Sequence, residues 1–189
     1  MDKKIIEQIR EHALYAKDKK IVLGRGVSSN VEFLIFGEAP GKRENQQGEP
    51  FVGRSGAVLD HWLNVAQVTS YYISNVVPLM PLNPQGKIRK PTNDERIYFK
   101  FFVNWMLQKV KPKCVIVLGD SAAKALTGKD VNQIKGKVDR IGNIPLAGIY
   151  HPARYMRRGE HKTTGSRDFC EAVNLLRRSS GGGTCLTRL

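Results

Sequence analysis

The 189-residue chain is poor in cysteine and has no long apolar segment. Its three cysteines, Cys114, Cys170 and Cys185, are odd in number and widely spaced, which excludes a disulfide framework and suits a reducing compartment. No apolar run reaches the roughly 18 residues that a membrane-spanning helix needs, so we expect no transmembrane segment. The N-terminus shows no apolar signal core, so export is not expected.

Acidic residues are also scarce, since 17 Asp and Glu face 31 Lys and Arg, for a formal net charge of +14. A charge of this size draws a protein to polyanions. Nucleic acid is the leading class of partner, and an anionic membrane surface is the second. Charge alone does not choose between them, and a merely soluble basic protein is a third interpretation.

Predicted strands alternate with predicted helices along the chain. Short apolar or β-branched runs predict four strands, at 31–36, 71–77, 114–119 and 144–150. Apolar periodicity, with a capping box at Thr92 and Glu95, predicts helices at 2–17, 55–67, 92–107, 120–126 and 167–178. The alternation predicts an α/β fold, a three-layer α/β/α sandwich with a central, mainly parallel four-stranded sheet. We expect a single domain over 1–178 and a flexible C-terminal tail over 179–189.

Polar loops follow the ends of these strands, where parallel sheets bind their ligands. The loop 37–53 is rich in glycine and holds two separated carboxylates, Glu38 and Glu44. Phe51 is an apolar ring in this polar loop, and it either pins the loop to the core or offers a platform to a flat ligand. The loop lacks the GK[ST] ending of a Walker phosphate loop, which excludes that interpretation.

Asn75 lies near the end of the second predicted strand, and His151 follows the fourth. The Asn75 amide offers a donor and an acceptor together, which suits the edge of a nucleobase, although a turn cap is the commoner use of such a residue. His151 precedes a basic loop that contains Arg154, Arg157 and Arg158. Arginines beside apolar side chains are typical of proteins that push between stacked bases.

Together these loops resemble the uracil-DNA glycosylase superfamily, most closely its family 4. The loop 37–53 is similar to that family's GEAPG…ED…GxPFVGxxG motif, and 151–154 is similar to its HPS or HPA block. The segments 73–77 and 115–122 resemble its second and third blocks. The resemblance implies a DNA base-excision repair enzyme that flips uracil out of DNA and hydrolyses its N-glycosidic bond, leaving an abasic site.

The resemblance also implies a role for each matching residue. Glu38 and His151 are expected to be catalytic, with Glu38 orienting or activating the attacking water and His151 donating to the uracil carbonyl. Substrate binding is expected from Ala39, Glu44, Phe51 and Asn75, of which Phe51 stacks on uracil and Asn75 selects it over cytosine. DNA binding is expected from the basic residues Lys87, Arg89, Lys90, Arg154, Arg157 and Arg158.

The number and positions of the cysteines differ from the family 4 pattern. Family 4 proteins usually carry four cysteines that bind a [4Fe–4S] cluster, but here none lies before Phe33, near Leu79 or within 92–107. We therefore expect no metal and no cofactor. Apolar Leu14, Leu79 and Phe102 are expected to fill that corner instead. Asn45 stands where the family usually has Asp.

Two other functions stay open. Related branches of the superfamily remove hypoxanthine or xanthine, and the charge of +14 fits a non-catalytic DNA-binding replication accessory equally well. In each case the expected partner is DNA, single- or double-stranded, and no membrane. We expect a monomer that acts in the cytoplasm, on the nucleoid of a prokaryote, or in a host nucleus or viral replication site.

Overall fold

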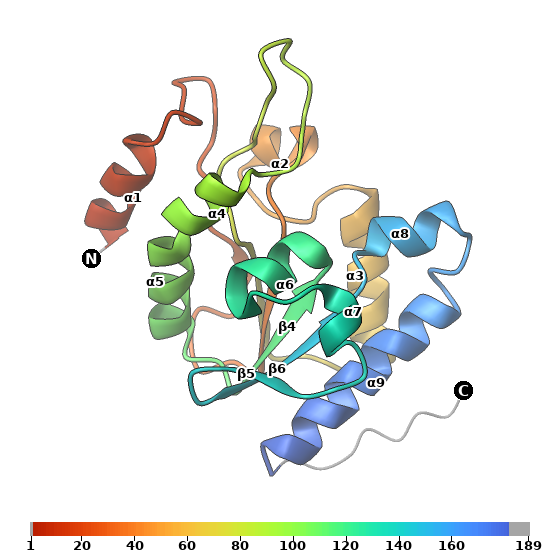
Figure 1. Cartoon of the computed structure of the whole chain (residues 1–189). Helices are drawn as coiled ribbons and strands as arrows, with labels where there is room; N and C mark the ends of the chain where they lie inside the picture. The colour runs from red at the N-terminus through yellow and green to blue at the C-terminus, as the bar shows by residue number, and fades with distance from the viewer. Residues whose placement is uncertain (1, 182–189) are drawn as a thin grey trace.

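The computed structural model describes residues 2–181, and its centre is a six-stranded sheet of order β1-β3-β2-β4-β6-β5 (Figure 1). The four inner strands run parallel: β2 (Phe33–Gly37), β3 (Tyr71–Asn75), β4 (Cys114–Leu118) and β6 (Ile144–Ile149). The predicted α/β class and mainly parallel sheet are confirmed. Two antiparallel edge strands, β1 (Arg25–Gly26) and β5 (Asp139–Ile141), were not predicted because two or three residues show no periodicity.

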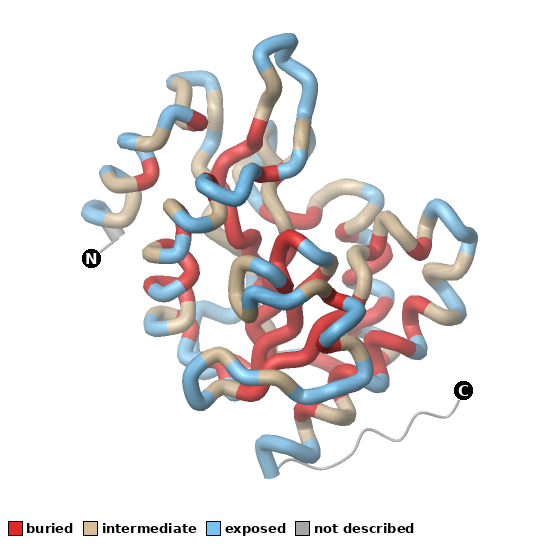
Figure 2. The backbone as a smooth tube through the Cα atoms, in the orientation of Figure 1, coloured by how far each residue is buried: buried red, intermediate tan, exposed pale blue. Residues whose placement is uncertain are grey.

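Helices cover both faces of the sheet and give the predicted three layers. One face carries α4 (Asn93–Tyr98), α5 (Lys100–Val110), α6 (Asp120–Thr127) and α7 (Val131–Ile134). The other carries α3 (Arg54–Val65), α8 (Pro152–Arg157) and α9 (Thr164–Ser179). Every residue of β2 and β4 is buried, which is why these strands are continuous apolar runs in the sequence (Figure 2).

Several helices differ from the prediction in length. The first, α1 (Asp2–Arg10), ends before residue 17 because the His12 imidazole accepts the backbone N–H of Leu14 at 3.0 Å and the chain turns there. The helix predicted over 92–107 is divided into α4 and α5 at Phe99, although its capping box is present as predicted. Short helices, α2 (Lys42–Gln47) among them, replace segments predicted as loops.

The carboxyl ends of the inner strands meet at one edge of the sheet. Gly37 at the end of β2 pairs with Asn75 at the end of β3, and the N–H of Gly119 donates to the carbonyl of Ile149 at 2.8 Å. The loops that the sequence singled out therefore gather at this edge. At the other end of the chain, Ser179 belongs to α9, and residues 182–189 of the predicted tail lie outside the described residues. Over 2–181, the helices are too short or too polar to cross a membrane.

Candidate active site

A cavity of about 200 Å³ opens at the carboxyl edge of the sheet. It is lined by residues from the loop 37–53, from the start of α3, from the end of β3 and from the segment after β6. The lining residues are Ala39, Gly41, Glu44, Phe51, Ser55, Asn75 and His151. The structure thus brings all four predicted substrate-binding residues together with His151, whereas Gly41 and Ser55 were not predicted.

Gly37 leaves room for two of these side chains to meet. A Cβ atom at Gly37 would lie 2.5 Å from Cζ of Phe51 and 2.6 Å from Oδ1 of Asn75, so a larger residue would push both away. Asn75 is only 2% exposed, yet within residues 2–181 its side-chain amide makes no hydrogen bond. Because Asn75 lines the cavity, its amide can offer a donor and an acceptor to a ligand there.

Phe51 forms a wall of the cavity. Its ring centroid lies 5.8 Å from that of His151, with 32° between the two planes. The side chain is 6% exposed and also packs against the apolar cluster under α3, so it both pins the loop and presents its ring to the cavity. Its backbone φ of +55° is unfavourable for a residue with a side chain, which is a feature common at functional sites.

Arg25 holds this strained backbone in place, a role that the sequence analysis missed. Its guanidinium donates to the carbonyl oxygens of Pro50 at 3.0 Å and Phe51 at 3.4 Å, and it pairs with Asp60 at 2.6 Å. The Phe51 carbonyl also passes so close to Gly56 that a Cβ atom there would lie 1.7 Å from it. Both neighbours constrain the backbone from which the Phe51 side chain extends.

His151 caps the N-terminus of α8. Its Nδ1 atom accepts the backbone N–H of Ala153 at 3.2 Å. Burial, with the positive charges of Arg157 and Lys90, lowers the pKa of His151 to about 4. The imidazole is therefore neutral near pH 7, and since Nδ1 accepts, its proton lies on Nε2, where it can be donated to a ligand.

A second cavity, of about 450 Å³, shares Ala39 and His151 with the first. Glu38 lines it, and the carboxylate of Glu38 accepts a hydrogen bond from the hydroxyl of Ser121 at the start of α6. Ser121 is buried and was not predicted as a site residue. The available signal was its position directly after the third predicted strand, at the same edge as the other loops.

The predicted DNA-binding residues fall into two groups. Lys90, Arg154 and Arg157 line the second cavity beside His151. Arg154 also stacks on the ring of Tyr150, with its guanidinium carbon 3.7 Å from the ring centroid. The structure does not bring the others into either cavity: Lys87 and Arg158 are exposed on the surface, and Arg89 pairs with Glu95 at 2.5 Å.

Glu44 and Asn45 are neighbours in the loop 37–53, and their side chains bind different segments. Glu44 lines the first cavity, and its carboxylate accepts the backbone N–H of Gly53 at 3.2 Å, which ties the middle of the loop to its end. Asn45 instead accepts the backbone N–H of Lys20 at 3.1 Å. An aspartate would accept the same bond, so the exchange at this position keeps the link to the N-terminal segment.

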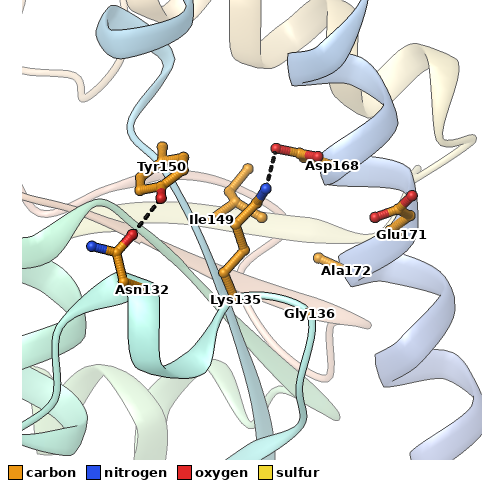
Figure 3. Close-up of a pocket in the computed structure, with 8 residues that line it drawn as sticks. All are labelled: Asn132, Lys135, Gly136, Ile149, Tyr150, Asp168, Glu171 and Ala172. Carbon is orange, nitrogen blue, oxygen red and sulfur yellow. Dashed lines mark hydrogen bonds and ion pairs between the residues drawn. The ribbon is translucent and has the colours of Figure 1, made fainter.

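A network of polar side chains connects α8 to α9. Asp168 on α9, 6% exposed, accepts the hydroxyl of Tyr155 on α8 and pairs with Nζ of Lys135 at 2.7 Å. Figure 3 shows this ion pair in a third cavity, of about 240 Å³, beside the hydrogen bond between Tyr150 and Asn132. Burial and the Asp168 carboxylate raise the pKa of Tyr155 far above its usual value. The network was not predicted, and it fixes the helix that His151 caps.

The residues present do not fit a [4Fe–4S] cluster. The chain has three cysteines, one fewer than the four thiolates that such a cluster needs. Cys114 in β4 and Cys170 in α9 are buried, and residues 2–181 hold no group of three or more His, Cys, Asp or Glu placed to bind a metal ion. The residues expected to fill the corner, Leu14, Leu79 and Phe102, are buried together in one apolar cluster.

Comparison of the sequence with known proteins points to the same family as the loop motifs. A family model described as "Uracil DNA glycosylase superfamily" matches residues 23–177. The "Type-4 uracil-DNA glycosylase" of Archaeoglobus fulgidus is 30% identical over 176 residues, which cover 87% of this chain and 86% of that protein. The protein of the same name from Pyrobaculum aerophilum is 31% identical over 169 residues, or 82% of each chain. That from Thermotoga maritima is 29% identical over 150 residues, or 76% of each.

Proposed function

Because the chain belongs to the uracil DNA glycosylase superfamily, we propose that it is a uracil-DNA glycosylase of base-excision repair. The observation that carries the proposal is the cavity in which the Phe51 ring, the Asn75 amide and the His151 imidazole meet. A base inside a duplex cannot reach such a cavity, so the enzyme rotates the nucleotide out at a cost of a few kcal/mol.

Phe51 and Asn75 recognise the base. Stacking of uracil on the Phe51 ring returns about 1–3 kcal/mol. The unpaired Asn75 amide donates to O4 of uracil and accepts its N3–H. Cytosine carries an amino group at C4 and no proton on N3, so its edge does not match the donor and acceptor of the Asn75 amide.

His151 and Glu38 promote the bond cleavage. As the bond from C1′ to the base nitrogen breaks, negative charge gathers on uracil, and the Nε2–H of His151 donates to the carbonyl oxygen that receives it. The sugar becomes positively charged, and the carboxylate of Glu38, held by Ser121, stabilises it and orients a water. The water oxygen bonds to C1′, and its proton passes through Glu38 to neutralise the uracil anion.

The basic side chains bind the DNA backbone. Lys90, Arg154 and Arg157 flank the site, and Lys87 and Arg158 extend the cationic surface beyond it. Contacts of this kind bind phosphate without reading sequence, so affinity falls steeply with salt. We propose that a monomer accepts uracil in single or double strands, and that it works where the cell keeps its DNA, in the cytoplasm or in a nucleus.

A panel of oligonucleotides tests the proposal. Each carries one uracil, hypoxanthine, xanthine or cytosine, in single- and double-stranded form, and release of the free base is measured. We expect release of uracil, and its loss in the variants Glu38→Gln and His151→Ala, which excludes a contaminating glycosylase. Preferred release of hypoxanthine or xanthine would overturn the choice of base, and DNA binding without any release would indicate a non-catalytic accessory.

A further inference from the structure

Residues 82–90 form a hairpin that projects beyond the carboxyl edge of the sheet (Figure 1). Leu82 and Ile88 form an antiparallel bridge across it. At the tip, the Asn83 side-chain oxygen accepts the backbone N–H groups of Gln85 at 3.1 Å and Lys87 at 2.8 Å. The hairpin thus has an internal structure, and its end leads into Lys90, which lines the second cavity.

Arg89 closes the base of this hairpin. Its guanidinium donates from Nε to the carbonyl of Leu82 at 3.2 Å and from Nη1 to the carbonyl of Lys90 at 2.9 Å. Its backbone N–H donates to the carbonyl of Pro81 at 3.1 Å. One side chain therefore bridges the chain entering the hairpin and the chain leaving it.

Glu95 on α4 holds Arg89 in this position. Its two carboxylate oxygens accept Nη1 at 2.8 Å and Nη2 at 2.5 Å, the paired geometry that arginine favours. It also accepts the backbone N–H of Thr92 at 2.7 Å, and its side chain is 9% exposed. Burial raises the pKa of Glu95, but the bonds from Arg89 and Thr92 outweigh this and leave the pKa below its ordinary value. The carboxylate is therefore charged near pH 7.

These bonds use four of the five N–H donors of the Arg89 guanidinium. Arg89 is thus engaged within the protein, and the cation available to DNA is its neighbour Lys90. The side chain of Lys90 lines the second cavity with Glu38 and His151, and its charge contributes to the low pKa of His151.

We propose that Arg89 and Glu95 are a positioning pair, which holds the hairpin so that Lys90 binds a phosphate of the DNA strand beside His151. The proposal rests on the proposed function for the identity of the ligand. Glu95 acts through Arg89 and Lys90 and does not touch the DNA. Losing it should therefore weaken DNA binding even though the protein becomes more positively charged.

The affinity of a fluorescein-labelled, uracil-free oligonucleotide, measured by anisotropy at several salt concentrations, tests the proposal. Lys90→Met should lower the slope of log affinity against log salt by about one, the loss of one phosphate contact. Glu95→Gln should weaken binding in the same direction, and the double variant should bind no more weakly than Lys90→Met alone. Thr92→Ala is the matched control, because it removes the capping hydroxyl and leaves the ion pair.

Binding by Glu95→Gln that equals or exceeds the wild type would overturn the proposal, since net charge alone would then explain the affinity. Additive losses in the double variant would also overturn it. Arg89→Lys keeps the charge but not the paired geometry, and it should weaken DNA binding too. This variant tests the pair at Arg89, as Glu95→Gln tests it at Glu95. Because the oligonucleotide carries no uracil, these results do not depend on catalysis, and absence of uracil release by the wild type would count against the proposed function alone.

Discussion

The Nδ1 atom of His151 accepts the backbone N–H of Ala153 at 3.2 Å, which leaves the imidazole proton on Nε2. Protonation would add the ring's second proton at Nδ1 and break this bond. Burial and the charges of Arg157 and Lys90 oppose protonation as well and lower the pKa of His151 to about 4. A neutral donor at a fixed position is what a departing base needs, because the charge on the base develops only as the bond breaks.

Replacing this donor should slow the reaction without releasing the DNA. We expect His151→Ala to lower kcat by about 100- to 1000-fold, the usual effect of removing one donor to a developing anion. The affinity for DNA should stay unchanged. His61→Ala, an exposed histidine on α3, is the control and should behave as the wild type. Full activity of His151→Ala would show that the donor is elsewhere.

The pKa of His151 predicts a pH dependence. In the folded protein it is lowered from 6.5 to about 4, so the unfolded chain binds the proton more strongly between these values. The contribution to stability is therefore complete above pH 6.5 and is lost as the pH falls through 4. NMR titration of the His151 ring should show a midpoint near 4, with kcat unaffected by this group above pH 5. A midpoint near 6.5 would contradict the lowered pKa of His151 and the burial that causes it.

Asn75 should determine which pyrimidine base binds in the cavity. Asn75→Asp keeps the size of the side chain but removes its N–H donor, so O4 of uracil would face a carboxylate oxygen. We expect release of uracil to fall by about 100-fold or more, as for sites that lose a required hydrogen bond. Asn64→Asp on the exposed side of α3 makes the same change in charge and should have little effect. Unchanged selectivity in Asn75→Asp would remove Asn75 from base recognition.

The network behind α8 should matter for both stability and rate. Asp168→Asn leaves Lys135 without its partner and weakens the bond to Tyr155, so we expect a loss of about 3 kcal/mol in the free energy of unfolding and a lower kcat. Glu171→Gln is the matched control, because Glu171 is exposed on the same helix and lines the same cavity (Figure 3). Thermal unfolding and uracil release measure the two effects. Equal behaviour of the two variants would contradict the anchoring role.

Much of the fold could be predicted because the sheet is covered on both faces. Its inner strands are continuous apolar runs, and these stand out in the sequence. The division of the predicted 92–107 helix at Phe99 could not be read in the same way. Phe99 is fully buried and its ring contacts His12 of the N-terminal segment, and this tertiary contact favours the break over the local helical pattern.

The site could be predicted where a side chain stands at the end of a strand or just after it, as Asn75 and His151 do. It was not predictable where the role depends on a contact between distant segments. Ser121 binds Glu38 across 83 positions of sequence, and Arg25 supports Phe51 across 26. Arg89 is a further case, because its basic surroundings suggested a phosphate contact but gave no sign that its guanidinium pairs with Glu95.

Single-turnover release of free uracil from a uracil-containing oligonucleotide tests the central claim most directly. With enzyme in excess, the rate reports bond cleavage without product release. The wild type should free uracil and leave an abasic site, and His151→Ala should bind the same DNA but react about 100- to 1000-fold more slowly. Intact DNA after incubation with folded, DNA-binding wild-type protein would contradict the claim.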